Sequence, residues 1–274
     1  MSHFRFRTFR EDELHALARA MAESRPFPHV VIPDCIVDPP AAVLGGFPSA
    51  DHPGWRRHSD AYEAHKMSFG DLEQMPEPLA SMVHELSAAP FLQFLERVTG
   101  IKGLMPDPYL QGAGLHWSGA NGVNAPHTDT HINERLAVFR RVNVLIYLNP
   151  GWVESNGGCF ELYDPVDSSS PCRTVVPTWG TCLIFRSDAR SVHGFSRPIA
   201  AGCVRRAIAV YYYTSLDASV FSGSFMTMWA QHEEYWDLVG APTPARQARM
   251  HVYRTLRFGA KALSYLAHRM RPRI

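Results

Sequence analysis

The feature that most constrains the fold is a change of sequence period at Tyr109. Before this residue, apolar side chains recur at helical spacing, whereas after it they fall in short extended runs separated by Gly, Pro, Asn and Ser clusters. The runs with strand character are residues 109–116, 126–131, 141–149, 159–164, 173–176, 181–186, 192–195 and 205–213. Eight such strands predict a double-sheet jelly roll, so the fold class is mainly β with flanking helices.

The segments outside these strands read mostly as helix. Residues 11–23 and residues 76–99 carry apolar side chains at helical spacing, and residues 39–44 open with two prolines, which favours a helix start. Residues 29–33 read as a short strand, while the polar residues 51–69 fit no regular element and are left as an active-site loop or plain surface.

Length and composition predict one elaborated domain. A chain of 274 residues with 46% hydrophobic residues can bury a sizeable core. We expect N-terminal support in residues 1–108, a jelly-roll core in residues 109–214 and a helical extension in residues 215–274. Within that extension, residues 225–239 read as a covering helix rich in Met and Trp, and these side chains are more often core than cofactor contacts.

The charge is distributed unevenly along the chain. Residues 243–274 hold eight basic side chains and no acidic one, so the formal charge of +1 leaves the first 242 residues at about −7. The body is therefore not expected to bind nucleic acid. The tail reads as a helix with an apolar seam, for which packing on the barrel or on a second subunit is favoured over contact with a membrane or an acidic carrier. The protein is accordingly expected to be a monomer or a homodimer.

Cysteine usage favours a reducing compartment. The five cysteines are odd in number, scattered, and contain no C-x-x-C pair, which argues against a disulfide framework and against a thiolate zinc site. The first residues precede no long apolar run, and the longest apolar stretch, Val142–Leu148, is too short to span a bilayer. We therefore expect a cytoplasmic protein.

The strongest candidate for a functional site is a set of metal ligands. His127 and Asp129 are two residues apart, so on a strand their side chains leave the same face. His193, on a later strand, would complete a triad, and two imidazoles with one carboxylate would leave about three of six octahedral positions open. His131 continues the pattern on the same face, but a strand-end histidine bonded to solvent is the simpler interpretation.

The spacing of these residues resembles that of the Fe(II)- and 2-oxoglutarate-dependent dioxygenases, and most closely the prolyl-hydroxylase-like branch, including bacterial stand-alone tailoring enzymes. His193 follows Asp129 by 64 residues, and Arg205 follows His193 by 12 and opens an apolar strand. The segments Arg141–Asn149 and Asn156–Tyr163 are similar to the strand pair that follows the HxD motif in that branch. The resemblance covers residues 109–214, with a weaker echo at residues 26–34.

The resemblance implies a double-stranded β-helix with Fe(II) held by His127, Asp129 and His193, with 2-oxoglutarate and dioxygen as cosubstrates. Strand alternation lets only one of the adjacent Arg205 and Arg206 face the interior. Arg205 is favoured because the inward set then becomes Arg205, Ala207, Ala209 and Tyr211, which matches the register of that branch, and it is expected to pair with the far carboxylate of the oxo-acid. The remaining expected cosubstrate residues are Tyr147 and Asn143, which share a strand face.

Three further observations refine the expected site. Trp117 stands ten residues before His127, where many relatives carry a tyrosine, so a hydroxyl contact is lost while stacking on the cosubstrate stays open. Glu161 and Asp164 are three apart on a strand and face opposite sides, so we expect a solvated strand end and no acid–base pair. Because Asp129 is present, halogenation is not expected.

Three functions follow from this pattern. The leading hypothesis is an oxygenase that hydroxylates or otherwise oxidises an unactivated carbon of a small molecule or carbohydrate-type biosynthetic intermediate, releasing succinate and CO2. Ring closure, desaturation and epimerisation stay open as other outcomes of the same chemistry. The second is a protein hydroxylase acting on prolyl side chains. The third is a non-catalytic jelly roll that binds metal as a sensor, which would have no reason to combine the triad with Arg205 and Tyr147.

Overall fold

The computed structural model describes residues 6–58 and 62–215 continuously, together with residues 228–229, 243–245, 248–249, 251–253, 255–256, 259 and 263. Two compact units are present, Met1–Ala230 and Gln231–Ile274. The first unit contains the sheet and the helices that cover it, and it is the unit that holds the candidate site.

The helices of the first unit match the sequence pattern closely. They are α1 (Glu11–Glu23), α2 (Pro40–Leu44), α3 (Leu79–Ser87) and α4 (Ala89–Thr99). The helical predictions over residues 11–23, 39–44 and 76–99 are thereby confirmed. Helix α4 ends at Gly100, whose φ of 72° lies in the left-handed region that glycine adopts without steric cost.

One sheet contains all thirteen strands that the structure describes. The strands are β1 (His29–Ile32), β2 (Arg56–His58), β3 (Glu63–Phe69), β4 (Met105–Pro106), β5 (Gly114–Thr128), β6 (Ile132–Asn133), β7 (Val138–Tyr147), β8 (Phe160–Tyr163), β9 (Pro171–Val175), β10 (Cys182–Arg186), β11 (His193–Phe195), β12 (Arg205–Ser215) and β13 (Met228–Trp229). Their main order is β1-β10-β7-β12-β5-β11-β8-β9, with β3 and β13 also paired to β5. All the pairings are antiparallel, and the predicted double-stranded β-helix is confirmed.

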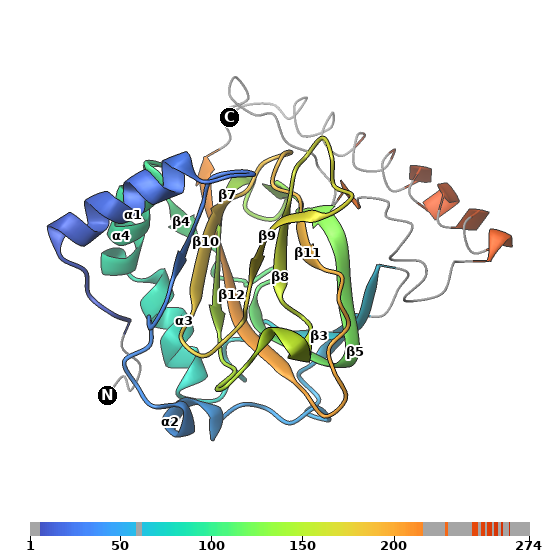
Figure 1. Cartoon of the computed structure of the whole chain (residues 1–274), viewed down its shortest axis with the longest axis horizontal. Coiled ribbons are helices and arrows are strands. Elements are labelled where there is room, and N and C mark those ends of the chain that lie inside the picture. Colours follow the sequence, from blue (N-terminus) through green and yellow to red (C-terminus); the bar gives the residue numbers. More distant parts are fainter. Residues whose placement is uncertain are drawn as a thin grey trace, which may run out of the picture. The chain divides into compact units, whose positions relative to one another are not determined.

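The central strands separate an outer layer from the barrel interior. Along β12, Ile208, Val210 and Tyr212 join a buried cluster with α1, α3 and α4, which cover one face of the sheet (Figure 1). The alternate residues Ala207 and Ala209 belong to a second cluster inside the barrel. Period-two alternation along β12 therefore decides which residues reach the interior.

Strand β5 corrects the prediction of two separate strands at residues 109–116 and 126–131. Gly114–Thr128 is one strand that pairs with β3, β12 and β11. The Ala120-Asn121-Gly122 segment, which looks like a turn in the sequence, is instead an irregularity within the strand, where Asn121 adopts a φ of 61°. Such a bulge lets one strand bend from one side of the barrel to the other without breaking its pairing.

Residues 51–69, which the sequence left unassigned, contain β2 and β3. These strands pair with each other, and β3 runs along β5. The structure thereby adds a wall to the barrel beside the strand that carries His127. Polar residues at inward positions had obscured the period-two pattern of this segment.

The covering helix predicted over residues 225–239 is wrong at Met228–Trp229, which form β13 and pair with Thr128 and His127 of β5. Pairing to β5 satisfies backbone groups at the end of that strand, and this tertiary contact overrides the local pattern. The rest of residues 225–239 lies outside the described residues.

The second unit is helical wherever it is described between residues 244 and 263. Of the predicted seam, Tyr253, Leu256 and Leu263 are exposed, and Met250, Ala260, Ala267 and Met270 lie outside the described residues. Among the described helices, none is both long and apolar enough to cross a membrane.

Candidate metal centre

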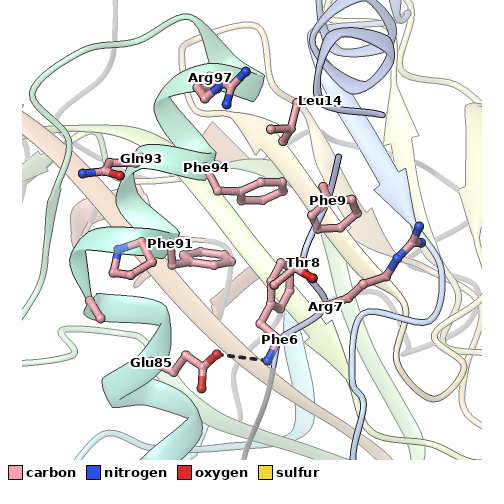
Figure 2. Close-up of a pocket in the computed structure, with 12 residues that line it drawn as sticks. Phe6, Arg7, Thr8, Phe9, Leu14, Glu85, Phe91, Gln93, Phe94 and Arg97 are labelled. Carbon is pink, nitrogen blue, oxygen red and sulfur yellow. Dashed lines mark hydrogen bonds between the residues drawn. The ribbon is translucent and has the colours of Figure 1, made fainter. Parts of the chain in front are cut away.

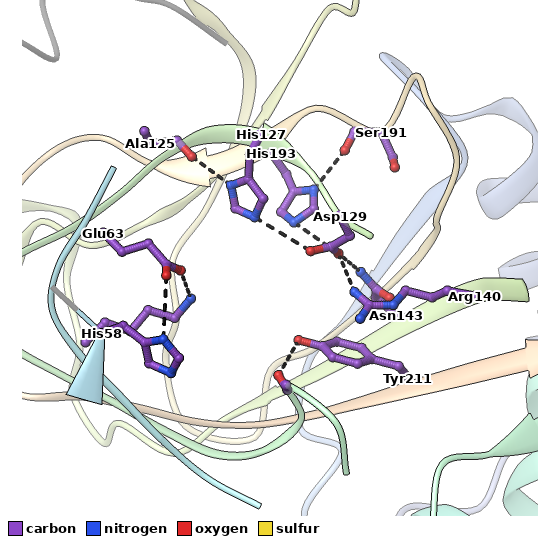
Figure 3. Close-up of polar contacts among 12 residues, drawn as sticks. His58, Glu63, Ala125, His127, Asp129, Arg140, Asn143, Ser191, His193 and Tyr211 are labelled. Atoms are coloured by element: carbon purple, nitrogen blue, oxygen red, sulfur yellow. Dashed lines mark hydrogen bonds and ion pairs between the residues drawn. The ribbon is translucent and has the colours of Figure 1, made fainter. Parts of the chain in front are cut away.

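Three side chains converge inside the barrel: His127 at the end of β5, Asp129 just beyond it, and His193 at the start of β11. Their ligand atoms all lie within 4.8 Å of one another. The Nε2 atoms of His127 and His193 lie 3.7 and 3.6 Å from the two oxygens of Asp129 (Figure 3). The register explains the meeting, since His193 is the direct partner of His127 in the β11–β5 pair. One cation can therefore contact all three groups.

Backbone carbonyls orient both imidazoles. Nδ1 of His127 lies 2.7 Å from the Ala125 carbonyl oxygen, and Nδ1 of His193 lies 2.8 Å from that of Ser191. An Nδ1 proton donated to these carbonyls leaves each Nε2 lone pair aimed at the shared centre. Burial, partly opposed by Asp129, lowers the pKa of His193 to about 4, so its imidazole is neutral near pH 7, as a metal ligand requires.

Asp129 is held by two polar partners from β7. Nη1 of Arg140 lies 3.1 Å from Oδ2 of Asp129, and Nδ2 of Asn143 donates to the same oxygen at 2.6 Å. Burial alone would raise the pKa of Asp129, but Arg140 and the two imidazoles bring it well below its ordinary value. The carboxylate is therefore ionised and fixed in orientation. Asn143, predicted beside the cosubstrate, contacts a metal ligand in this arrangement.

Arg140 is the site residue that sequence reasoning missed. Strict alternation from Asn143 would send Arg141 inward, but the register of β7 with β12 shifts between Tyr212 and Tyr213. Because of this irregularity Arg140 faces the interior, where its guanidinium lies 3.8 Å from the centroid of the Tyr211 ring. The sequence signal for it was the adjacent pair Arg140 and Arg141, because a regular strand in the barrel must turn one of the two toward the interior.

Arg205 and Tyr147 lie close together and are both buried. Arg205 is only 4% exposed, its Nε donates to the Gly158 carbonyl oxygen at 2.8 Å, and no carboxylate of the described residues pairs with it. Its guanidinium carbon lies 5.0 Å from the centroid of the Tyr147 ring and 4.6 Å from that of Phe195. The Tyr147 hydroxyl is buried without a hydrogen-bond partner among the described residues.

These features fit the two groups that the sequence implies. A guanidinium kept from acidic partners and an unsatisfied phenol are complementary to one carboxylate of a dicarboxylic oxo-acid. Two imidazoles and one carboxylate suit Fe(II) and leave positions for a chelating ligand. Arg206, on the opposite face of β12, is half-buried and lies over the ring of Phe47 in the outer layer.

Three nearby predictions have a structural outcome. Trp117 packs against the outer cluster, because its neighbours Ser118 and His116 occupy the inner positions of β5, so it cannot stack on a cosubstrate. Glu161 is not solvated: it is 6% exposed and accepts hydrogen bonds from the Tyr163 hydroxyl and the Ser196 backbone N–H. His131 is fully buried, so the expected contact with solvent is wrong, and it is not among the clustered ligands.

Comparison with known proteins gives a consistent picture. Residues 113–213 match the family model of the 2OG-Fe(II) oxygenase superfamily. Prolyl 3-hydroxylase OGFOD1 from Mus musculus is 26% identical over 160 residues, which are 57% of this chain and 27% of that protein. The Xenopus laevis protein of the same name is 29% identical over 77 residues, 27% of this chain and 15% of its own length. This chain therefore spans about a quarter or less of the curated relatives it matches.

Solved structures extend the likeness at the level of fold. The prolyl hydroxylase from Trichoplax adhaerens, in complex with a peptide of the hypoxia inducible factor oxygen degradation domain, has a TM-score of 0.52 at 19% identity, covering 75% of this chain and 94% of that one. The non-heme alpha ketoglutarate dependent epimerase SnoN from nogalamycin biosynthesis has a TM-score of 0.50 at 14% identity, covering 73% and 84%. One fold thus accommodates peptide and small-molecule chemistry.

Proposed function

Because the chain belongs to the 2OG-Fe(II) oxygenase superfamily through residues 113–213, we propose that it oxidises an unactivated C–H bond of a small polar biosynthetic intermediate. The reaction consumes 2-oxoglutarate and dioxygen and yields succinate and CO2. The observation that carries the proposal is the placement of a buried, acid-free Arg205 and an unsatisfied Tyr147 hydroxyl in the interior that holds the metal ligands. A barrel that merely bound a metal would gain nothing from a desolvated cation there.

Each residue then has a physical role. His127, Asp129 and His193 would hold Fe(II), and the bound ion would supply the activation of dioxygen, with electrons from the oxo-acid. Arg205 binds the far carboxylate of 2-oxoglutarate and stays charged, while Tyr147 donates its hydroxyl to the same group. Arg140 and Asn143 fix the Asp129 carboxylate, so that its orientation toward the metal does not depend on the oxo-acid.

A prolyl-type protein hydroxylase is the second candidate. It is favoured by the identity to the Prolyl 3-hydroxylase OGFOD1 proteins, although the matched parts are a small share of those proteins. Both candidates use the same metal centre and the same cosubstrate, so they differ only in the substrate. Buried polar side chains in the barrel, among them Asn124, support a small polar substrate.

The reaction class can be tested without knowing the substrate. Under anaerobic conditions, Fe(II) and then 2-oxoglutarate are added to the metal-free protein, and the weak visible charge-transfer band of the chelated oxo-acid is recorded. We expect the band in the wild type, its loss in Asp129→Ala, and a 2-oxoglutarate requirement about tenfold or more higher in Arg205→Gln. Arg206→Gln, a neighbour facing the outer layer, is the control and should behave as the wild type. Tight zinc binding with no band would instead indicate a non-catalytic metal-binding barrel.

A further inference from the structure

The inner face of β3 carries a pair of charged side chains that neither the metal nor 2-oxoglutarate requires. Glu63 and Lys66 are three residues apart, so a regular strand would send them to opposite faces. His65 between them adopts a φ of 51°, and the register with β5 shifts at this point. The resulting bulge brings both side chains to one face, where Lys66 Nζ lies 2.5 Å from a Glu63 oxygen and each side chain is less than one fifth exposed.

The pairing of strands places this ion pair beside the proposed site. Lys66 lies opposite Ser118 of β5, which in turn lies opposite Arg205 of β12. Because directly opposed residues share a face of a sheet, Lys66 and Arg205 both face the interior.

Glu63 faces the interior in the same way, on the side of the metal ligands. It lies opposite Asn124, which is paired with Phe195 on the strand of His193. Burial alone would raise the pKa of Glu63, but Lys66, and to a lesser extent His127, lower it to about 2. In Figure 3, Glu63 and His58 occupy the side of the site opposite Arg140.

The chemistry of this wall specifies what it can bind. A desolvated ion pair adds little net stability, so stability alone does not account for it. Lys66 is an ammonium donor, Glu63 is a carboxylate acceptor, and Asn124 is 7% exposed with its Oδ1 lacking a hydrogen-bond partner among the described residues. His58 adds a ring nitrogen 2.8 Å from the Ser68 hydroxyl. An apolar ring placed against these groups would bury them without replacing their contacts with water.

We propose that the substrate is a polyhydroxylated small molecule of glycoside or polyol type, held by Glu63, Lys66 and Asn124. A hydroxyl group both donates and accepts, so neighbouring hydroxyls can donate to Glu63 and accept from Lys66 without separating the ion pair. A further hydroxyl donates to Asn124 Oδ1. The inference rests on the proposed oxygenase function and names the substrate class of the same site.

The test measures binding rather than turnover. Saturation-transfer NMR is run on zinc-loaded protein with 2-oxoglutarate, using methyl glucoside, methyl galactoside, inositol and an N-acetylproline amide as probes. We expect saturation transfer to at least one polyol and none to the prolyl probe. The double variant Glu63→Gln, Lys66→Met keeps the wall neutral and avoids leaving one buried charge alone, and it should bind that polyol at least about tenfold more weakly.

Matched variants separate recognition from folding. Met67→Leu alters the opposite face of β3, in the outer cluster, and should leave polyol binding unchanged. Asn124→Leu removes the unsatisfied amide oxygen and should weaken binding without changing the 2-oxoglutarate requirement. Binding of the prolyl probe, absence of transfer to every polyol, or equal polyol binding by the double variant would each overturn the proposal.

The outcome is independent of the oxygenase test. Loss of polyol binding in the double variant with an intact charge-transfer band supports the substrate class. A normal band together with no polyol binding leaves an oxygenase with another substrate. Polyol binding with no band overturns the proposed oxygenase function on which the inference rests, because the pocket would then belong to a binding protein.

Discussion

Replacing Arg140 by methionine removes the cation that neutralises Asp129 in the metal-free protein. The two charged groups are 3.1 Å apart, and their side chains are 9% and 16% exposed. With an effective dielectric constant of about 20, a pair at this distance interacts by roughly 5 kcal/mol, and breaking a buried pair costs about 3–5 kcal/mol. Asn143 still donates to the carboxylate, so we expect a loss near the lower end, about 3 kcal/mol.

A bound metal should reverse most of this loss. A divalent cation supplies two positive charges to the same carboxylate, so the metal-loaded variant is expected to be within about 1 kcal/mol of the wild type. The measurement is thermal and urea unfolding of Arg140→Met, with and without Zn(II). For a chain of this size about 3 kcal/mol corresponds to roughly 6–12 °C in Tm.

The control is Arg141→Met, since Arg141 is adjacent in sequence but is half-buried and donates to the Thr214 hydroxyl. It should change the stability of the two forms equally and by less than about 1 kcal/mol. An equal loss of stability in metal-free and metal-loaded Arg140→Met would refute the reasoning, because the arginine would then serve packing and not the carboxylate.

Three other results are expected. The pKa of Glu63 is lowered to about 2, so its contribution to stability is present above the unfolded value near 4.5 and is lost as pH falls toward 2. The unfolding free energies of metal-free wild type and Glu63→Gln should therefore differ by up to about 3 kcal/mol at pH 7 and become equal in acid. A difference that does not change with pH would argue against the ion pair. Tyr147→Phe should raise the 2-oxoglutarate requirement about fivefold, the effect of one hydrogen bond, with the charge-transfer band retained, whereas no change would place the hydroxyl away from the oxo-acid. The His65 side chain is exposed, and its backbone lies in the left-handed region. In urea unfolding, His65→Gly should therefore be neutral or stabilising by up to about 1 kcal/mol, whereas His65→Val should cost about 1–2 kcal/mol. The reverse order of stability would contradict the bulge.

Regular alternation accounts for the parts of the architecture that the sequence could predict. Along β12 it sends Arg205, Ala207 and Ala209 inward, and on β7 it does the same for Asn143 and Tyr147. The helices were equally accessible because their apolar spacing and terminal residues are local properties of the chain. Alternation could not predict the residues that surround the triad and Arg205.

The missing parts depend on backbone conformations that carry no strong sequence signal. His65 and Asn121 adopt positive φ values although neither is glycine, and each lies where the β3–β5 register is interrupted. Because histidine and asparagine adopt the left-handed region only occasionally, their presence in the sequence does not predict a bulge. Strand β3 and the ion pair on it could therefore not be predicted without the strand pairing of the structure.

The two pairs of adjacent arginines show how far a sequence pattern can be taken. On any regular strand, one member of such a pair must face the interior, and an interior guanidinium is costly unless it meets an anion. For Arg205 and Arg206 the register of β12 is regular, and the predicted member, Arg205, is the one that faces the interior. For Arg140 and Arg141 the bulge opposite Tyr212 and Tyr213 reverses it. Each pair places one guanidinium in the interior. Arg140 pairs with the Asp129 carboxylate, whereas Arg205 has no carboxylate partner among the described residues. Arg205 is therefore the residue suited to an anionic cosubstrate.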